Sequence, residues 1–253
     1  MTEARLTHIV RHPVKSLGYQ ELTAAALSKG RLLPFDRHWA LATEGAPFSG
    51  APEGWVPKMA FVRGVAEGTL QAITARFDDA TGHLVLSHPA RADFIGHLPH
   101  DAAALIDWVR PLWPATRPAP ARLVSRQDGG ALSDVPEGWI SVLNLASNRE
   151  LGTRMGRDLS IHRWRGNLWL DGLAPWQEND LIGRDIQIAH VHLRVEARIT
   201  RCLATTFDPV TGAQDGDTLT ALKAGWGHQD FGVYARVLND GNIALGDRMS
   251  VLA

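Results

Sequence analysis

Short stretches rich in β-branched and aromatic residues recur along the whole chain, and Gly, Pro and Asp residues separate them. This pattern is typical of β-strands joined by turns. The predicted strands are LTHIV, HLVLSHP, ARLVSR, WISVLNL, NLWLDGL, the long DIQIAHVHLRVEARIT, GVYARVL and DRMSVL. Many closely spaced strands with few helices favour a barrel over a sheet built from alternating strands and helices. We therefore expect a mainly β protein with some α-helix, of the α+β class.

Three helices are predicted from their capping residues, because short polar side chains start helices and glycine ends them. The first begins at Asp101 and stops near Pro114, the second begins at Ser147 or Asn148 and stops at Gly152 or Gly156, and the third has Asp217 as its N-cap and Gly225 just past its end.

One segment predicts a domain boundary. PLWPATRPAPARL contains Pro111, Pro114, Pro118 and Pro120, and a chain so rich in proline behaves as a stiff, extended linker. We therefore expect a smaller β-rich N-terminal domain over residues 1–112 and a second β-rich domain over residues 122–253. Binding sites are often formed between two such domains.

Composition and charge exclude several classes of partner. The formal net charge is −1, so no electrostatic argument favours nucleic acid or an anionic membrane. No stretch approaches the roughly 18 apolar residues of a membrane-crossing helix, and the N-terminal residues do not resemble a signal peptide. The single cysteine rules out an internal disulfide and favours a reducing compartment. We expect a cytoplasmic protein that binds neither nucleic acid nor membrane.

That cysteine, Cys202, follows a strand with strict alternation. From Val191 to Ile199 the odd positions are apolar, whereas the even positions are His, Arg, Glu and Arg. Cys202 has even parity, so it falls on the polar side if no bulge intervenes. Arg198 and Arg201 are close in sequence, and nearby positive charge favours a thiolate. These observations favour a reactive or ligating thiol over an inert core residue.

Several roles for this thiol remain open. No segment is similar to the nucleophile region of papain-like or caspase-like proteases. A zinc site would need about three more ligands, and no other cysteine is present. His190 and His192 could bind a metal from one strand face, but no acidic third ligand stands at a suitable spacing. A thiolate bound to a soft transition metal, with a cofactor supplying the other ligands, is a further option.

Six segments together resemble the MOSC domains, the molybdenum cofactor sulfurase C-terminal family. RCLATTFDPVTG is similar to the R-C-x-x-T-x-x-D-P-x-T-G segment of that family. The other segments, which occur in the order that the family has, are HPVKSLGYQ, LLPFDRHWAL, WISVLNLASNREL, RWRGNLWLDGLAPWQENDLIG and FGVYARVLNDGNIALGD. The resemblance covers nearly the whole chain, and its nearest type is the group of the mitochondrial amidoxime-reducing component and the bacterial YcbX-like proteins.

The resemblance implies a fold and a cofactor. It implies a MOSC β-barrel beside a smaller N-terminal β-rich domain, with the molybdenum cofactor (molybdenum bound to molybdopterin) in a cleft between them. Cys202 matches the position that supplies a sulfur to molybdenum and takes part in catalysis. Pyridoxal phosphate is not implied. The positions that match or flank cofactor-binding positions of the family are Lys15, Ser16, Arg37, Ser147, Arg165, Asn167 and Arg201.

The resemblance also implies an activity, namely a molybdenum-dependent oxidoreductase that reduces N-hydroxylated small molecules such as amidoximes. Some relatives carry a ferredoxin domain, which needs about four cysteines, whereas this sequence has one. We therefore expect electrons to come from a separate electron-transfer protein. The alternative is a non-redox role, in which Cys202 carries a persulfide for sulfur transfer or the protein holds the cofactor for delivery.

Overall fold

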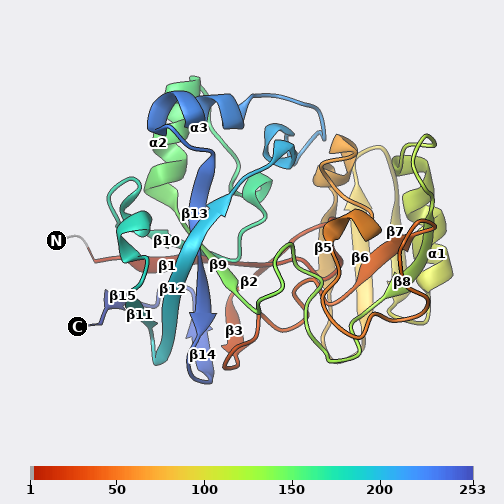
Figure 1. Cartoon of the computed structure of the whole chain (residues 1–253), viewed down its shortest axis with the longest axis horizontal. Coiled ribbons are helices and arrows are strands. Elements are labelled where there is room, and N and C mark those ends of the chain that lie inside the picture. Colours follow the sequence, from red (N-terminus) through yellow and green to blue (C-terminus); the bar gives the residue numbers. More distant parts are fainter. Residues whose placement is uncertain (1–2, 253) are drawn as a thin grey trace.

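The computed structural model describes residues 3–252, and it confirms a mainly β protein with few helices. The strands form two lobes (Figure 1). The sheet lobe is built around an eight-stranded sheet that carries α2 (Leu145–Met155) and α3 (Thr218–Trp226). The hairpin lobe comprises residues 40–124 and contains α1 (Ala102–Val109).

The large sheet brings together strands from both ends of the sequence. Its order is β15 (Met249–Val251), β11 (Asp185–Ile188), β12 (Val191–Thr200), β13 (Asp230–Val237), β9 (Ile140–Asn144), β10 (Leu168–Asp171), β1 (Arg5–Arg11) and β2 (Gln20–Leu22). The β9–β10 pair is parallel and the other neighbours are antiparallel. Apolar side chains such as Leu6, Leu193 and Val233 form a fully buried core on one face, and α2 and α3 pack over a second cluster that contains Trp164, Trp169 and Phe231.

The expected closed barrel is not present as a continuous ladder. Within residues 3–252 the ladder runs from β15 to β2, and β1 is joined to the β15 edge by one isolated bridge, between Arg5 and Arg248. Backbone hydrogen bonds accompany this bridge, including Met249 N to Ala4 O at 2.8 Å and Leu6 N to Asp247 O at 2.9 Å. The sheet therefore curves until its two sides touch near the chain ends, but pairing over a full strand length does not close it.

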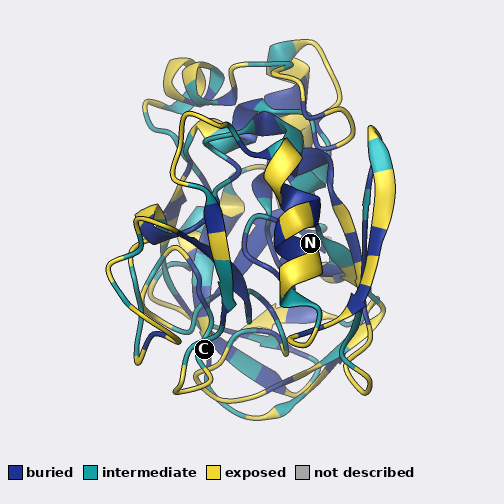
Figure 2. Cartoon of the chain, turned by 90° about the vertical axis from the view of Figure 1, so that its right-hand side faces the viewer, coloured by how far each residue is buried: buried dark blue, intermediate teal, exposed yellow. Residues whose placement is uncertain are grey.

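The hairpin lobe has its own sheets and its own core. β5 (Thr74–Phe77), β6 (His83–His88) and β7 (Arg91–His97) form a three-stranded meander, and β4 (Ala40–Thr43) pairs with β8 (Pro120–Val124). α1 lies against this lobe and buries Leu105, Ile106, Trp108 and Val109. Figure 2 shows the helix with one buried and one exposed face, which is the arrangement of an amphipathic surface helix.

Hydrogen bonding crosses the predicted boundary between residues 112 and 122. β1 and β2 complete the large sheet, and β3 (Ala24–Leu27) pairs with β14 (Gly241–Ala244). In the opposite direction, β8 begins within the proline-rich segment, at Pro120, and pairs with β4 in the hairpin lobe. The division into 1–112 and 122–253 stays a prediction, and the two lobes do not follow it.

The predicted helix starts are confirmed at Asp101 and Asp217. α2 instead begins one turn earlier than expected, because Asn144 caps it by accepting from Ala146 N. α3 continues through Gly225 to Trp226, and it ends there because Gly227, with φ 76°, adopts the left-handed conformation and donates from N to Lys223 O. The long predicted strand divides into β11 and β12 at Ala189, whose φ is 51°.

Short 3-10 helices occupy many of the connections. They are η1 (Lys58–Ala60), η2 (Gly68–Ala72), η3 (Arg110–Leu112), η4 (Ile161–Trp164), η5 (Gln177–Leu181) and η6 (Leu203–Thr206). None of the helices within residues 3–252 has both the length and the apolar character that crossing a bilayer demands.

Candidate functional site

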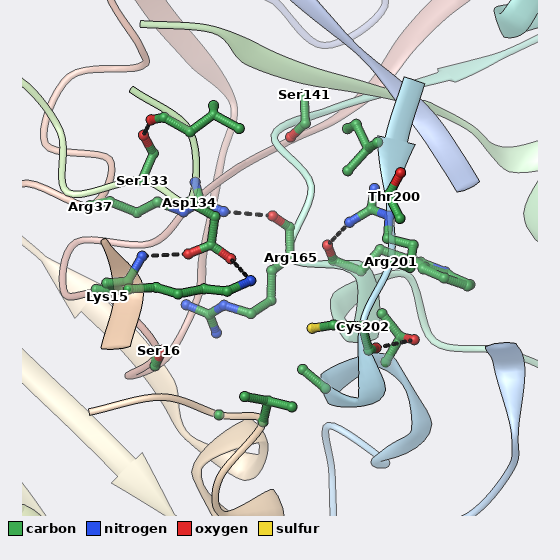
Figure 3. A pocket seen from close by; sticks show the side chains of 18 of the residues that line it. Lys15, Ser16, Arg37, Ser133, Asp134, Ser141, Arg165, Thr200, Arg201 and Cys202 are labelled. Carbon is green, nitrogen blue, oxygen red and sulfur yellow. Dashed lines mark hydrogen bonds and ion pairs between the residues drawn. The ribbon is translucent and has the colours of Figure 1, made fainter. Parts of the chain in front are cut away.

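A pocket of about 410 Å³ lies where the two lobes meet, and both lobes contribute side chains to it. Seven of the eight predicted site residues line it, although they come from four separate stretches of sequence. These seven are Lys15, Ser16, Arg37, Arg165, Asn167, Arg201 and Cys202. Figure 3 shows six of them around one open space, with Asp134 among them. The pocket is therefore the candidate site.

The pocket lining is strongly cationic. It contains eight Lys or Arg residues and a single carboxylate, that of Asp134. The cationic residues are Lys15, Arg37, Lys58, Arg63, Arg163, Arg165, Arg198 and Arg201. Partly buried charges of one sign attract ligands of the opposite sign, because the surrounding protein screens them less than water does. The lining thus favours an anionic ligand.

Three of the lining residues have a left-handed backbone that non-glycine residues rarely adopt. The φ angles are 65° at Ser16, 51° at Arg37 and 49° at Arg165. Such conformations cost free energy and cluster at functional sites, where the surrounding structure holds them in place. Half of the six non-glycine residues with positive φ within residues 3–252 lie in this one pocket.

Lys15 is buried, and its ammonium group is held on one side. Nζ donates to Leu132 O at 2.8 Å and to Asp134 Oδ1 at 2.5 Å. Burial lowers the pKa of Lys15, and the Asp134 carboxylate partly opposes this shift. Burial would raise the pKa of Asp134, but Lys15 and Lys58 together lower it to about 2. An ammonium group has three protons to donate, so Lys15 retains one for a ligand.

Arg37 and Arg165 are locked together by a buried network. Arg37 pairs with Asp36 through Nη1 and donates to Arg165 O from Nη2 at 2.8 Å. Asp36 is fixed by the buried His12, whose backbone N–H donates to Oδ1 at 2.7 Å. Burial lowers the pKa of Arg165 to about 9, and the nearby Arg37 guanidinium contributes to this shift. Two partly buried guanidinium groups side by side are costly, and an anion between them would relieve that cost.

Arg201 and Asn167 also line the pocket, but their polar atoms are used within the protein. Arg201 donates to Phe231 O from Nε at 2.8 Å and to Trp164 O from Nη1 at 2.7 Å. Asn167 accepts from Ser141 Oγ at 2.8 Å and donates to Val10 O at 3.0 Å. Arg201 therefore fixes the backbone next to Cys202, and Asn167 fixes β1, β9 and β10 relative to one another.

Cys202 is half-buried, and its sulfur points into the pocket on the side of the Arg165 side chain (Figure 3). The alternation of side chains along β12 does not explain this position, because the strand has two register irregularities and ends at Thr200, before Cys202. Instead, Cys202 immediately precedes η6, where Thr205 N and Thr205 Oγ1 donate to Cys202 O at 3.1 and 3.0 Å. These bonds turn the chain and leave the thiol facing the cavity.

Ser147 does not reach the pocket, so the structure gives no support to a cofactor contact there. Its Oγ donates to both carboxylate oxygens of Glu178 at 2.8 Å, and Asn144 Nδ2 donates to Oε2 of Glu178 at 2.9 Å. Glu178 is fully buried, and burial raises the pKa of this carboxyl. The start of α2, which we expected to attract an anion, is therefore already occupied by an internal carboxylate.

Sequence analysis missed several lining residues, of which Lys58, Arg63 and Asp134 carry charge. Lys58 begins η1 and the other two lie in loops, and none of the three belongs to a recognised motif, so only the meeting of the two lobes identifies them. The His190 and His192 pair does not form a metal site. His190 lies in the turn between β11 and β12, and residues 3–252 contain no cluster of three or more His, Cys, Asp or Glu that could hold a metal ion.

Comparisons with known proteins identify the same domain family that the sequence motifs resemble. Residues 130–250 match the sequence model of the MOSC domain. The chain is 30% identical over 131 residues to a protein named molybdenum cofactor sulfurase from Drosophila grimshawi. The alignment covers 49% of this chain and 17% of that protein. It is 32% identical over 123 residues to mitochondrial amidoxime-reducing component 1 of Mus musculus, with coverages of 44% and 36%.

The matched segments thus make up about a third or less of these relatives. Among solved structures, the YUAD protein from Bacillus subtilis aligns with 99% of this chain and 96% of its own, at 12% identity and a TM-score of 0.47. The family match includes Cys202 and the segments on both sides of it. Residues 130–250 therefore form a MOSC domain.

Proposed function

We propose that the pocket binds the molybdenum cofactor, with Cys202 as the protein ligand of the metal. One observation carries this proposal: the only thiol of the chain faces a pocket in which cations outnumber carboxylates eight to one. Soft thiolate ligands suit transition metals of this kind. The phosphate of a molybdopterin requires cations and hydrogen-bond donors.

The side chains of the pocket fit the two ends of such a cofactor. Lys15, Arg37 and Arg165 would hold the phosphate end, since each has at least one donor that the protein does not use. Ser16 would add a hydroxyl donor. Arg201 and Asn167, which our sequence analysis placed in direct contact with the cofactor, would instead hold the surrounding backbone in position.

We propose further that the protein reduces N-hydroxylated compounds. A bound molybdenum cofactor would supply the two-electron chemistry that removes the hydroxyl oxygen. Cys202 would hold the metal, and the cationic walls would hold the rest of the cofactor. Electrons would come from a separate electron-transfer protein. The similarity to the murine amidoxime-reducing component supports this class of substrate.

A direct experiment tests both parts. The protein is purified from a host that makes molybdenum cofactor, and its molybdenum and pterin contents are measured. We expect about one molybdenum per chain, together with reduction of benzamidoxime by reduced viologen. Molybdenum far below one per chain contradicts the binding proposal, whereas full molybdenum without turnover contradicts only the reductase proposal.

A second candidate is a carrier of the cofactor or of sulfur. The similarity to the Drosophila molybdenum cofactor sulfurase and the half-buried position of Cys202 favour this role. A persulfide on Cys202, detected by mass spectrometry after incubation with a sulfur donor and lost in Cys202→Ala, would support this role. A protein that forms this persulfide but does not reduce benzamidoxime would contradict the reductase proposal.

A further inference from the structure

We propose that Arg63 and Arg198 form a second anion site beside Cys202, and that the substrate of this pocket carries a carboxylate or a similar anionic group. This inference rests on the proposed reductase function and specifies its substrate class. Both arginines line the same pocket as Cys202. Arg63 follows η1 in the hairpin lobe, whereas Arg198 lies near the end of β12 in the sheet lobe.

The cations of the pocket divide into two sets by how their charges are compensated. Lys15 is paired with Asp134, and Arg37 is paired with Asp36. Arg63 and Arg198 have no carboxylate within ion-pair distance among residues 3–252. Arg165 and Arg201 also lack such a carboxylate, but they donate to the backbone oxygens of Gly18, Phe231 and Trp164. The charges of Arg63 and Arg198 are therefore available to a ligand, whereas those of Lys15 and Arg37 are already partly neutralised.

The guanidinium group of Arg63 has hydrogen-bond donors that the described part of the chain leaves unpaired. Its Nε is buried and has no hydrogen-bond partner within the described part of the chain. Nη1 meets only the sulfur of Met59, at 2.6 Å. Burial lowers the pKa of Arg63, and the nearby Arg117 acts in the same direction. A bound anion would satisfy the unused donors and offset this repulsion.

The backbone around Arg63 is tied to the segment that carries Cys202. Gly64 packs against the side chain of Gln71, and a Cβ at Gly64 would lie only 2.6 Å from Gln71 Nε2. Gln71 is buried and donates to Ala204 O at 3.5 Å, two residues beyond Cys202. Arg63 is thus placed close to the thiol by packing between the lobes, which allows one small molecule to contact both.

The chemistry of the two arginines defines the ligand. A guanidinium group presents a planar fork of donors that matches a carboxylate in two parallel hydrogen bonds. The lining around Cys202 also includes the apolar surface of Val65 and Ala204. These features fit an N-hydroxylated compound with an acidic group at the opposite end of a short apolar body.

A matched pair of substrates tests the proposal. 4-Carboxybenzamidoxime and 4-carbamoylbenzamidoxime have nearly the same size but differ by one charge. With cofactor-loaded protein at constant pH and salt, we expect kcat/KM for the acid to exceed that for the amide by about tenfold, mainly through KM. Arg63→Gln should lower this ratio by about tenfold, and Arg198→Gln should lower it less because Arg198 is exposed.

Two controls keep the outcomes distinct. Arg110→Gln removes an exposed arginine outside the pocket, and it should leave the ratio unchanged. Binding of 4-carbamoylbenzoate, which has no N–O bond, is measured by calorimetry for the wild type and for Arg63→Gln.

The outcomes separate the two proposals. Arg63-dependent binding without any turnover supports the anion site and contradicts the reductase function. Equal kcat/KM for both substrates, together with equal binding by the wild type and Arg63→Gln, overturns the anion site while the reductase function stands. Loss of molybdenum in Arg63→Gln also overturns it, because the arginine would then hold the cofactor.

Discussion

We expected residues of the inter-lobe pocket and Ser147 at the start of α2 to contact the same cofactor. The two places differ in whether their hydrogen-bond donors are already used within the protein. In the pocket, Lys15 and Arg165 have donors to spare. At the start of α2, the hydroxyl of Ser147 and the amide of Asn144 are directed at Glu178. The pocket keeps unused donors even after Lys15 pairs with Asp134, whereas Glu178 takes both the hydroxyl and the amide at the start of α2.

The strongest test of the pocket is Cys202→Ala. We expect the rate of benzamidoxime reduction with reduced viologen to fall by at least about 100-fold. Mutation of a residue that only hydrogen-bonds to a metal ligand already lowers metal affinity or activity by about 10–100-fold, and Cys202 would be the ligand itself. The free energy of unfolding should change by less than about 1 kcal/mol, since the thiol has no hydrogen-bond partner within residues 3–252. Unchanged turnover would remove the thiolate from the mechanism.

Lys15→Met tests the phosphate end of the pocket, because it keeps the aliphatic stem and removes the charge. We expect the affinity for the cofactor to fall by about tenfold. The fall is measured as a lower molybdenum content per chain after gel filtration. Lys58→Met is the matched control. Lys58 lies 3.7 Å from the same Asp134 but is far more exposed, so its loss should weaken retention less. Equal effects of the two changes would contradict the special position of Lys15.

Ser147→Ala tests the other side of the comparison. It removes a donor to Glu178 and the acceptor of Trp176 N, which lies 2.8 Å from Ser147 Oγ. We expect urea unfolding to show a loss of about 1–3 kcal/mol, while molybdenum per folded chain stays at the wild-type level. Thr153→Ala, which removes an exposed hydroxyl from the same helix, should cost much less. A stable variant that loses molybdenum would restore Ser147 to the cofactor site.

The smallest expected effect concerns pH. Because burial raises the pKa of Glu178 above its ordinary 4.5, the folded protein binds this proton more tightly than the unfolded chain. Stability should therefore decrease as pH rises from 4.5 through the raised pKa. In Glu178→Gln this decrease should be smaller, as measured by urea unfolding at several pH values. Glu150→Gln, an exposed change on α2, should keep the wild-type slope, and an identical slope in Glu178→Gln would contradict the assignment.

The local sequence predicted much of the secondary structure and most of the candidate site. The start of α3 follows from Asp217, whose side chain accepts from Thr220 N, whereas Asp101 occupies the N-cap position of α1 without a side-chain bond to the helix backbone. The β-runs follow from residue type and from alternation that holds along β12 as far as Val195. Resemblance to a family then identified seven of the lining residues, including Cys202, because the motif places each of them at a fixed position in its segment.

The tertiary structure alone decided which of these side chains are free. Glu178 lies 31 residues from Ser147, and Val10 lies 157 residues from Asn167, yet each uses the polar atoms of its partner. Arg63 likewise reaches the neighbourhood of Cys202 only because the lobes pack together. The sequence determines which donors and charges the chain possesses. Whether they meet a ligand or one another depends on contacts between distant segments, which no local pattern records.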